Sequence, residues 1–392
     1  MGGQALPAPT PNALPIEVNC RTIETGKRPK LDKPGDNIVM RNPAGMSEPM
    51  FLRNIWYCAA ESKELGSEPL GRVFLNEPVA LYRKADGAPI AFEDRCCHRR
   101  APLSKGKVEG DALRCGYHGF LYDPTGTCIW TPGQTNVPPD AIVRTYPLCE
   151  RHGYIWIWMG APAQADESAV PDFHWNDDPA WAETGAHLPV HCHYMLLVDN
   201  LMDLSHVAFL HINTIGSVED TDPDLTWERG PNFVRGTRVA PNLSASPRMK
   251  NEGITCNVDQ IKVMTYSPPA NVVIDISTTE SGVAPGAKGQ IDHRLFILGS
   301  MTPETEATCH YFWAASRNYK LNDDELTASM HQQVVTAFHE DKDMLEAEQR
   351  IIDFSPSAMQ VDVIGDAGGL QSRRMLDGMI AAENQEQFEA AE

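Results

Sequence analysis

The sequence contains no apolar run that approaches the roughly eighteen residues a membrane-spanning helix requires. Its first residues, MGGQALPAPTPNALP, have neither a basic start nor an apolar core, so no secretory signal is predicted. We therefore expect a cytoplasmic protein with no membrane partner.

Basic residues are scarce: 33 Lys and Arg stand against 53 Asp and Glu, a formal net charge of −20. Nucleic-acid phosphates would be repelled by this charge, so nucleic-acid binding is not predicted.

No GxGxxG dinucleotide signature follows a strand-like run, and no plant-type ferredoxin cysteine set is present. Electrons for any redox chemistry must then come from another protein.

The chain length of 392 residues exceeds what one hydrophobic core usually supports, so two domains are expected. Residues 1–48 are rich in Pro, Gly, Lys and Asn without a helix or strand period, which predicts an extended or disordered arm. Residues 49–162 hold short β-type runs between turn residues, as in an antiparallel β domain. Residues 163–392 combine a β-rich section with helices, one of them near 323–353, which predicts an α+β protein.

Ten cysteines in a long chain without a secretory signal favour reduced thiols and metal ligands over disulfides. Cys96 and His98 form a C-x-H pair, and Cys115 and His118 form a C-x-x-H pair. Each loop thus offers one sulfur and one nitrogen, as a Rieske [2Fe–2S] centre requires, and Gly116 is expected to ease the tight turn. A zinc ion with two Cys and two His ligands stays open, as do cysteines without any ligand role.

A second set of candidate ligands lies in NLMDLSHVAFLH, residues 200–211, where we expect a helix that follows a strand over 191–199. Asp203 and His206 share one face of such a helix, but His211 lies about 140° from His206 around the axis. Both histidines can bind one metal only if the helix ends or bends between them. A hydrogen-bonded core triad without a metal is the alternative.

The predicted helix near 340 supplies a carboxylate. Its inward-facing apolar stripe is expected to consist of Val334, Phe338, Leu345 and Ile352. Asp341 falls on this stripe, whereas Glu340 and Asp343 fall off it and are expected to face water. A buried carboxylate requires a cation, either a metal ion or an arginine.

These segments together resemble the Rieske non-haem iron oxygenases. CCHRRAPLSKGKVEGDALRCGYHGF resembles the cluster loops, and DNLMDLSHVAFLH resembles the iron-binding helix. TPETEATCHYFWAASRNY and FHEDKDMLEAEQR resemble the branch that contains vanillate and dicamba O-demethylases. The resemblance covers most of residues 50–385.

The resemblance implies a Rieske domain at 49–162 and a helix-grip catalytic domain at 163–392, with an antiparallel sheet covered by helices. It assigns the [2Fe–2S] cluster to Cys96, His98, Cys115 and His118. It assigns a mononuclear Fe(II) to a facial triad of two histidines and one carboxylate, namely His206, His211 and Asp341.

The resemblance also implies a head-to-tail homotrimer, in which the cluster of one subunit lies beside the iron of the next. Asp203 matches the aspartate that bridges the two sites in similar oxygenases. Asn200 matches a residue close to the iron, although an Asn before a helical run is more often a helix cap.

The branch implies a terminal oxygenase that uses O2 and two external electrons to hydroxylate an O- or N-alkyl carbon of a small aromatic compound, with loss of an aldehyde. Ring cis-dihydroxylation is the alternative. A ferredoxin and an NAD(P)H-dependent reductase, or one reductase with both functions, are the implied donors. A pure electron carrier or a zinc-stabilised binding protein would not explain the second ligand set.

The segment LFILGSM before Thr302 offers Gly299 and Ser300 rather than a cationic or imidazole anchor. It therefore favours a neutral aromatic substrate, such as an anilide.

Overall fold

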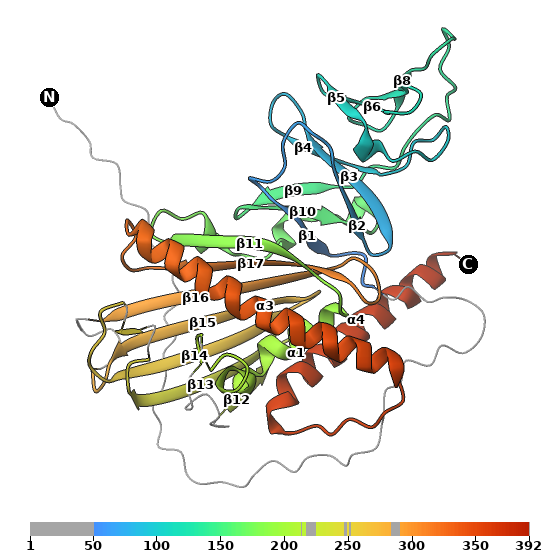
Figure 1. Ribbon diagram of the computed structural model, residues 1–392. Coiled ribbons are helices and arrows are strands. Elements are labelled where there is room, and N and C mark those ends of the chain that lie inside the picture. Colours follow the sequence, from blue (N-terminus) through green and yellow to red (C-terminus); the bar gives the residue numbers. More distant parts are fainter. Residues whose placement is uncertain are drawn as a thin grey trace, which may run out of the picture. The chain divides into compact units, whose positions relative to one another are not determined.

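The structure is a computed structural model that describes residues 51–212, 214–216, 225–246, 249–250, 252–283 and 291–391 (Figure 1). These residues belong to one packing unit of the chain. The arm predicted at 1–48 lies outside the described residues. Among the helices of the described ranges, none is long and apolar enough to cross a membrane.

The first domain consists of short antiparallel strands in three small sheets. One sheet has the order β1–β10–β9, with bounds Trp56–Glu61, Tyr154–Trp158 and Leu148–Arg151. The next has the order β2–β3–β4, with bounds Leu70–Phe74, Glu77–Arg83 and Pro89–Glu93. The last comprises β5 to β8, with bounds Lys107–Glu109, Ala112–Arg114, Leu121–Tyr122 and Cys128–Trp130. Leu75 and Asn76, both at positive φ, form the two-residue turn between β2 and β3, which suits the twist of a hairpin.

The second domain is a seven-stranded antiparallel sheet with the order β11–β17–β16–β15–β14–β13–β12. In chain order, strands β11 to β17 span Ala182–Val190, Leu225–Arg229, Val234–Leu243, Val258–Ser267, Asn271–Glu280, Asp292–Pro303 and Cys309–Arg317. Helix α1 (Tyr194–Met202) packs over β14 to β16, α3 (Asp324–Phe354) over β11, and α4 (Ala367–Ala391) over β13 and α1 (Figure 1). The predicted α+β class, with a helix-covered antiparallel sheet after a β domain, is confirmed.

Strands β16 and β17 are covered on both faces, which explains why every residue of β17 is buried. Tyr311 and Trp313 contact Phe338 of α3, with ring centroids 5.2 and 5.4 Å apart. Phe312 and Ala314 instead share a core cluster with Trp56 and other first-domain residues. The near-continuous apolar run CHYFWAAS is therefore a strand between two layers rather than a half-exposed edge.

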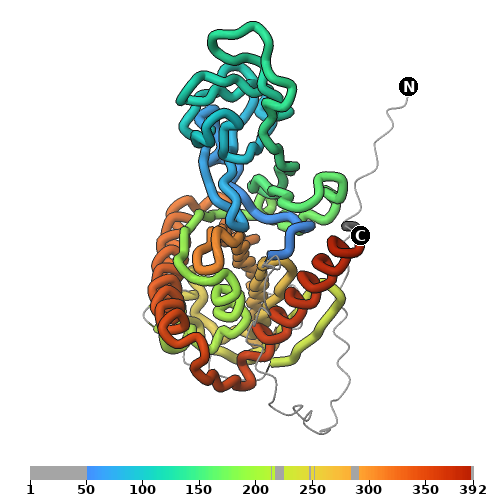
Figure 2. The backbone as a smooth tube through the Cα atoms, turned by 90° about the vertical axis from the view of Figure 1, so that its right-hand side faces the viewer, coloured from blue at the N-terminus to red at the C-terminus, as the bar shows by residue number. Residues whose placement is uncertain are grey.

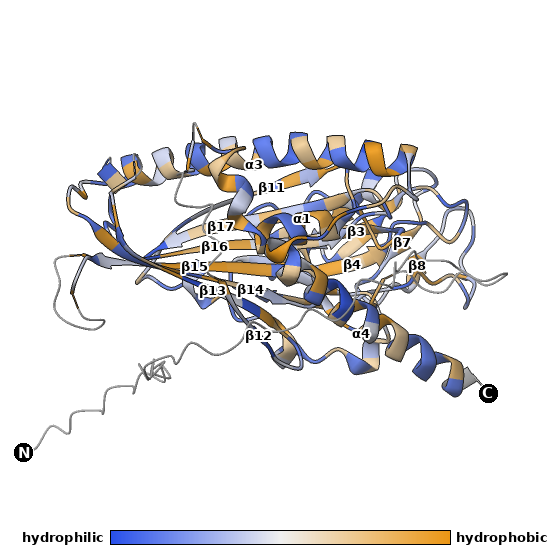
Figure 3. Cartoon of the chain, turned by 90° about the horizontal axis from the view of Figure 1, so that it is seen from below, coloured by the Kyte–Doolittle hydropathy of each residue, from blue (hydrophilic) through white to orange (hydrophobic). Residues whose placement is uncertain are grey.

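Helix α3 matches the helix predicted over 323–353 almost to the residue. Asp323 caps its N-terminus by accepting a hydrogen bond from the Leu326 backbone N–H at 2.9 Å. Hydrophilic and hydrophobic residues alternate along α3 (Figure 3), and its buried stripe includes Val334, Phe338 and Asp341.

Two predictions for the segment before the metal ligands are wrong. Residues 194–199 belong to α1, not to a strand, because their apolar side chains fill the space between the sheet and α4. His193 is not a strand residue either, since its Nδ1 caps α1 by accepting from the Met195 N–H at 3.2 Å.

The predicted domain boundary near 162 falls between β10 and β11, at the 3-10 helix η2 (Pro162–Gln164), and stays a prediction.

A fully buried hydrogen bond links the two domains. Thr302 of β16 donates its hydroxyl hydrogen to the Cys58 carbonyl of β1 at 2.6 Å.

We predict that Thr302→Val lowers the free energy of unfolding by about 1–3 kcal/mol, because the shape is kept while a buried carbonyl loses its donor. Urea unfolding followed by circular dichroism measures this change.

Thr226→Val is the matched control. The Thr226 hydroxyl also donates to a backbone carbonyl, that of Thr237, but it lies at the surface. Its loss should change stability by less than about 0.5 kcal/mol. Equal effects of the two substitutions would contradict the structural role of Thr302.

Candidate active site

The two predicted cluster loops meet beside the sheet β5–β8, with sulfur donors inside and nitrogen donors outside. Cys96 and Cys115 are each 2% exposed, and burial together with contact to the Cys96 thiol raises the pKa of the Cys115 thiol. His98 and His118 are exposed, with ring centroids 4.7 Å apart. This pairing fits a [2Fe–2S] cluster whose inner iron takes two thiolates and whose outer iron takes two imidazoles.

The same loops do not fit a single zinc ion. Within the described ranges, three side chains of the metal-binding types bring their ligand atoms within 4.8 Å of one another: His206, His211 and Asp341. The residues of the two loops form no such group. A tetrahedral zinc ion would require all four loop donors to converge on one point.

The structure corrects the expected role of Gly116 in the second loop. The glycine of this turn that has a positive φ, of 75°, is Gly119 and not Gly116. Gly116 is needed for close packing, because a Cβ there would lie 2.5 Å from the Lys105 carbonyl oxygen.

Tyr122 is a site residue that the sequence analysis missed. Its hydroxyl lies 3.1 Å from the Cys96 sulfur and 3.1 Å from that of Cys97, and burial and these thiols raise the Tyr122 pKa. The hydroxyl therefore keeps its proton and can donate to a ligand sulfur, an interaction that tunes cluster potentials. Its position inside an ordinary β-type run, GFLYD, carries no signal of this role.

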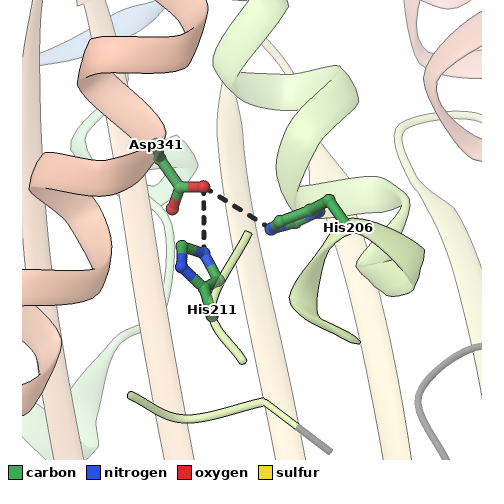
Figure 4. A group of neighbouring side chains, drawn as sticks. All are labelled: His206, His211 and Asp341. Atoms are coloured by element: carbon green, nitrogen blue, oxygen red, sulfur yellow. Dashed lines mark ion pairs between the residues drawn. The ribbon is translucent and has the colours of Figure 1, made fainter. Parts of the chain in front are cut away.

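The chain bends between α1 and His211, as two histidines on one metal require. Helix α1 ends at Met202, and the 3-10 helix η5 (Leu204–Ala208) ends three residues before His211. His211 Nε2 lies 3.0 Å and His206 Nε2 3.5 Å from Asp341 Oδ1 (Figure 4). The structure thus brings the three predicted iron ligands together from two separate parts of the chain.

Hydrogen bonds fix the orientation of both imidazoles. His206 Nδ1 lies 2.7 Å from the Asp203 carbonyl oxygen, and His211 Nδ1 lies 2.7 Å from a Glu340 carboxylate oxygen. Because these oxygens can only accept, each Nδ1 carries a hydrogen, and Nε2 is the atom of each ring that faces Asp341 and is left to bind a metal. Two imidazoles and one carboxylate held in this way suit a non-haem Fe(II) ion with open coordination positions.

Glu340 contradicts the expectation that it faces water. It is half-buried, and it accepts hydrogen bonds from His211 and from the Thr214 hydroxyl at 3.1 Å. The segment that follows His211 packs on this side of α3, so the apolar stripe alone could not reveal the contact. Asp343 is exposed, as expected.

Asn200 lies inside α1, so the alternative role as a helix cap is wrong. Its side-chain N–H donates to Asp341 Oδ1 at 3.1 Å, while its Oδ1 is buried and has no hydrogen-bond partner among the described residues. The described partners of the Asp341 carboxylate are Asn200 and the two histidines, not an arginine.

Asp203 joins α1 to η5 at a half-buried position. Its Oδ1 caps η5 by accepting from the Ser205 N–H at 2.9 Å. A Cβ on Gly365 would lie 2.6 Å from Asp203 Oδ2, so the chain passes close to this carboxylate.

A cavity of about 160 Å³ lies between the sheet and the helices and reaches all three predicted iron ligands. We call it the metal-site cavity. Its apolar lining includes Leu201, Ile274, Ile297, Val334 and Phe338. Such a cavity excludes water from the metal and suits an aromatic ring.

We predict that Glu340→Ala weakens metal binding at the His206, His211 and Asp341 site by about 10–100-fold, because the His211 ring loses the acceptor that orients it. Glu340→Gln keeps an acceptor and should fall between this variant and the wild type. Metal content after dialysis against a graded chelator series measures the effect.

Asp343→Ala is the matched control, since it removes an exposed carboxylate from the same helix. Its metal affinity should equal that of the wild type. Equal losses of metal affinity in both variants would mean that the overall charge of α3 sets the affinity, rather than the contact between Glu340 and His211.

Comparison with known proteins agrees with this arrangement along most of the chain. Residues 55–147 match the model of the Rieske [2Fe-2S] domain, and residues 190–382 match that of the vanillate O-demethylase oxygenase C-terminal domain. The toluene-4-sulfonate monooxygenase system iron-sulfur subunit of Comamonas testosteroni is 39% identical over 86% of this chain and 99% of its own. A vanillate O-demethylase oxygenase subunit of a Pseudomonas species is 36% identical, over 87% and 98%.

A solved structure shows the same fold. The crystal structure of dicamba monooxygenase bound to dicamba superimposes with a TM-score of 0.79 at 32% identity, over 87% of this chain and 99% of that one. The chain therefore belongs to the Rieske non-haem iron oxygenases, in the branch of vanillate and dicamba O-demethylases, whose terminal oxygenases use a [2Fe–2S] cluster and a mononuclear iron.

Proposed function

We propose that this protein hydroxylates an O- or N-alkyl carbon of a small aromatic compound, using O2 and two externally supplied electrons. The hydroxylated carbon then leaves as an aldehyde. The observation that carries the proposal is the metal-site cavity, which brings an apolar, ring-sized space directly against His206, His211 and Asp341.

The geometry of the donors supports the ligand roles that we propose. Cys96 and Cys115 would hold the inner iron of the cluster, and His98 and His118 the outer iron. His206, His211 and Asp341 would hold the mononuclear iron, which when bound supplies the oxygen-activating chemistry.

The remaining residues position and protect this site. The Asp203 backbone carbonyl and the Glu340 carboxylate accept the Nδ1 hydrogens of His206 and His211, so both rings keep one orientation. Asn200 donates to the carboxylate of Asp341 and limits its rotation. The apolar cavity walls keep water from the reacting carbon and pack the ring so that the alkyl group faces the ligands.

We propose that the electrons reach the iron from the cluster of a second copy of the chain in a head-to-tail homotrimer. The sheet β5–β8 beside the cluster loops and helix α1 beside the iron ligands lie at opposite ends of the described part (Figures 1 and 2). Exposed apolar side chains at the end of α3 and in the segment before α4, which passes close to Asp203 at Gly365, support such an interface; they are Phe354, Met359, Val361, Val363 and Ile364. The cluster in turn takes its electrons from a ferredoxin and an NAD(P)H-dependent reductase.

The function is tested first by metal analysis and product identification. We predict about three irons and two acid-labile sulfides per chain, with a brown colour that bleaches on reduction by dithionite. With a reductase system and a methoxy- or N-alkyl-substituted aromatic compound, one aldehyde should form per O2 consumed.

The product separates the alternatives. A cis-diol that retains the alkyl group would establish ring dihydroxylation instead. A colourless protein that contains zinc and no sulfide, even from anaerobic preparations, would overturn the oxygenase proposal.

The bridging role of Asp203 is tested by Asp203→Asn. Asn keeps the cap of η5, so the fold and both metal contents should be unchanged. Turnover should fall by about 10–100-fold or more, because the negative bridge between the two sites is lost. After dithionite reduction, O2 and substrate should reoxidise the cluster quickly in the wild type and slowly in the variant.

This interpretation fails if Asp203→Asn loses iron and added iron restores turnover. Asp203 would then act as a support for His206 within one subunit. Unchanged cluster reoxidation in the variant would also contradict it.

A further inference from the structure

The Tyr122 hydroxyl contacts a residue between two predicted cluster ligands as well as a ligand itself. Its oxygen lies 3.1 Å from the Cys96 sulfur, 3.1 Å from the Cys97 sulfur and 3.3 Å from the Cys97 backbone nitrogen. Tyr122 is fully buried, whereas Cys97 is exposed between Cys96 and His98. One phenol oxygen thus joins a ligand thiol inside the domain to a thiol at its surface.

The Tyr122 hydroxyl has a single hydrogen, and two sulfur atoms lie equally close to it. A Cys96 sulfur that binds iron is a thiolate, which accepts a hydrogen bond and has no hydrogen to donate. Charge-assisted hydrogen bonds are the stronger ones, so the hydroxyl hydrogen goes to Cys96 rather than to Cys97. The lone pairs of the phenol oxygen then remain for the N–H and the S–H of Cys97.

The two ligand sulfurs receive different donors. Burial raises the pKa of the Cys115 thiol, and backbone N–H groups of Tyr117 and His118 that donate to its sulfur oppose this effect. The Cys96 sulfur instead lies within hydrogen-bond distance of the Tyr122 hydroxyl. Backbone donors are fixed by the fold of the loop, but a hydroxyl hydrogen rotates about its C–O bond. The direction of the Tyr122 O–H is therefore the adjustable part of these hydrogen bonds.

We infer that Cys97 is a positioning residue for the cluster and acts through Tyr122. The S–H and the backbone N–H of Cys97 donate to the phenol oxygen, so the hydroxyl hydrogen stays on the side of Cys96. Hydrogen bonds in a chain polarise one another, and the Cys97 S–H thus strengthens the bond from Tyr122 to the Cys96 sulfur.

The consequence for the cluster is a higher reduction potential. A hydrogen-bond donor beside a ligand sulfur stabilises the reduced cluster, which carries one more electron, over the oxidised one. The inference rests on the proposed function, because it assigns a residue to the cluster that supplies the electrons.

The opposite direction of the contact with Cys97 would have the opposite effect. If Tyr122 donated to the Cys97 sulfur, the Cys96 sulfur would lose its donor, and removal of the Cys97 sulfur would return it. The sign of the change in potential therefore reports the direction of the hydrogen bond.

The test measures the midpoint potential of the cluster in the full, cluster-loaded chain by anaerobic redox titration. Cys97→Ala removes the S–H and keeps the backbone N–H. It should lower the equilibrium constant for reduction about two- to fourfold. At 59 mV per tenfold change for one electron, this is a shift of about 18–36 mV. Cys97→Ser keeps a donor and should have a potential close to that of the wild type.

Tyr122→Phe shows whether the effect passes through the phenol oxygen. It should lower the potential more than Cys97→Ala does, and adding Cys97→Ala to Tyr122→Phe should lower it no further. The electron paramagnetic resonance spectrum of the reduced cluster should be the same in all variants, because both ligand pairs are kept. Cys97→Val is a second side chain without a donor, in case Cys97→Ala does not assemble the cluster.

Cys149→Ala is the matched control, because it removes a half-buried thiol from β9 of the same domain. Its cluster should have the potential of the wild type. An equal shift in Cys149→Ala and Cys97→Ala would mean that the loss of any thiol from this domain changes the potential.

A raised potential in Cys97→Ala would overturn the inference, because Cys97 would then compete for the Tyr122 hydrogen. An unchanged potential, or an equal shift with and without the Tyr122 hydroxyl, would overturn it as well. The proposed function is judged separately, by iron, sulfide and aldehyde release. A protein that releases the aldehyde and whose potential is independent of Cys97 keeps the function and loses this inference.

Discussion

The site depends on a carboxylate buried on an apolar helix face. Asp341 is 3% exposed on α3, with Phe338 and Leu345 on the same stripe. A negative charge at such a place is unstable unless positive charge or several hydrogen bonds compensate it. Asn200 offers one hydrogen bond, and the hydrogen bonds and charges of Asp341 and Glu340 outweigh burial and raise the pKa of His211. In their neutral forms, with Nδ1 hydrogen-bonded to acceptors, both histidines turn an Nε2 lone pair toward Asp341. A metal cation satisfies the carboxylate and both lone pairs at once.

The orientation of the histidines explains why the surrounding segments are irregular. An uninterrupted helix would place His206 and His211 about 140° apart, so α1 gives way to η5 and η5 ends before His211. At the bend, the Asp203 carbonyl accepts a hydrogen bond from His206 Nδ1. The break that brings the ligands together therefore also fixes the ring of one of them.

Sequence reasoning reached the ligand sets but not their surroundings. Spacing revealed the two cluster loops, and the period of α3 placed Asp341 inside, because both signals lie within short stretches of chain. Glu340 is adjacent to Asp341 and about 100° around the helix, so its role depends on which segment packs there. Arg238 and Lys262 become neighbours only through the register of β13 and β14, which alternation within one strand does not determine.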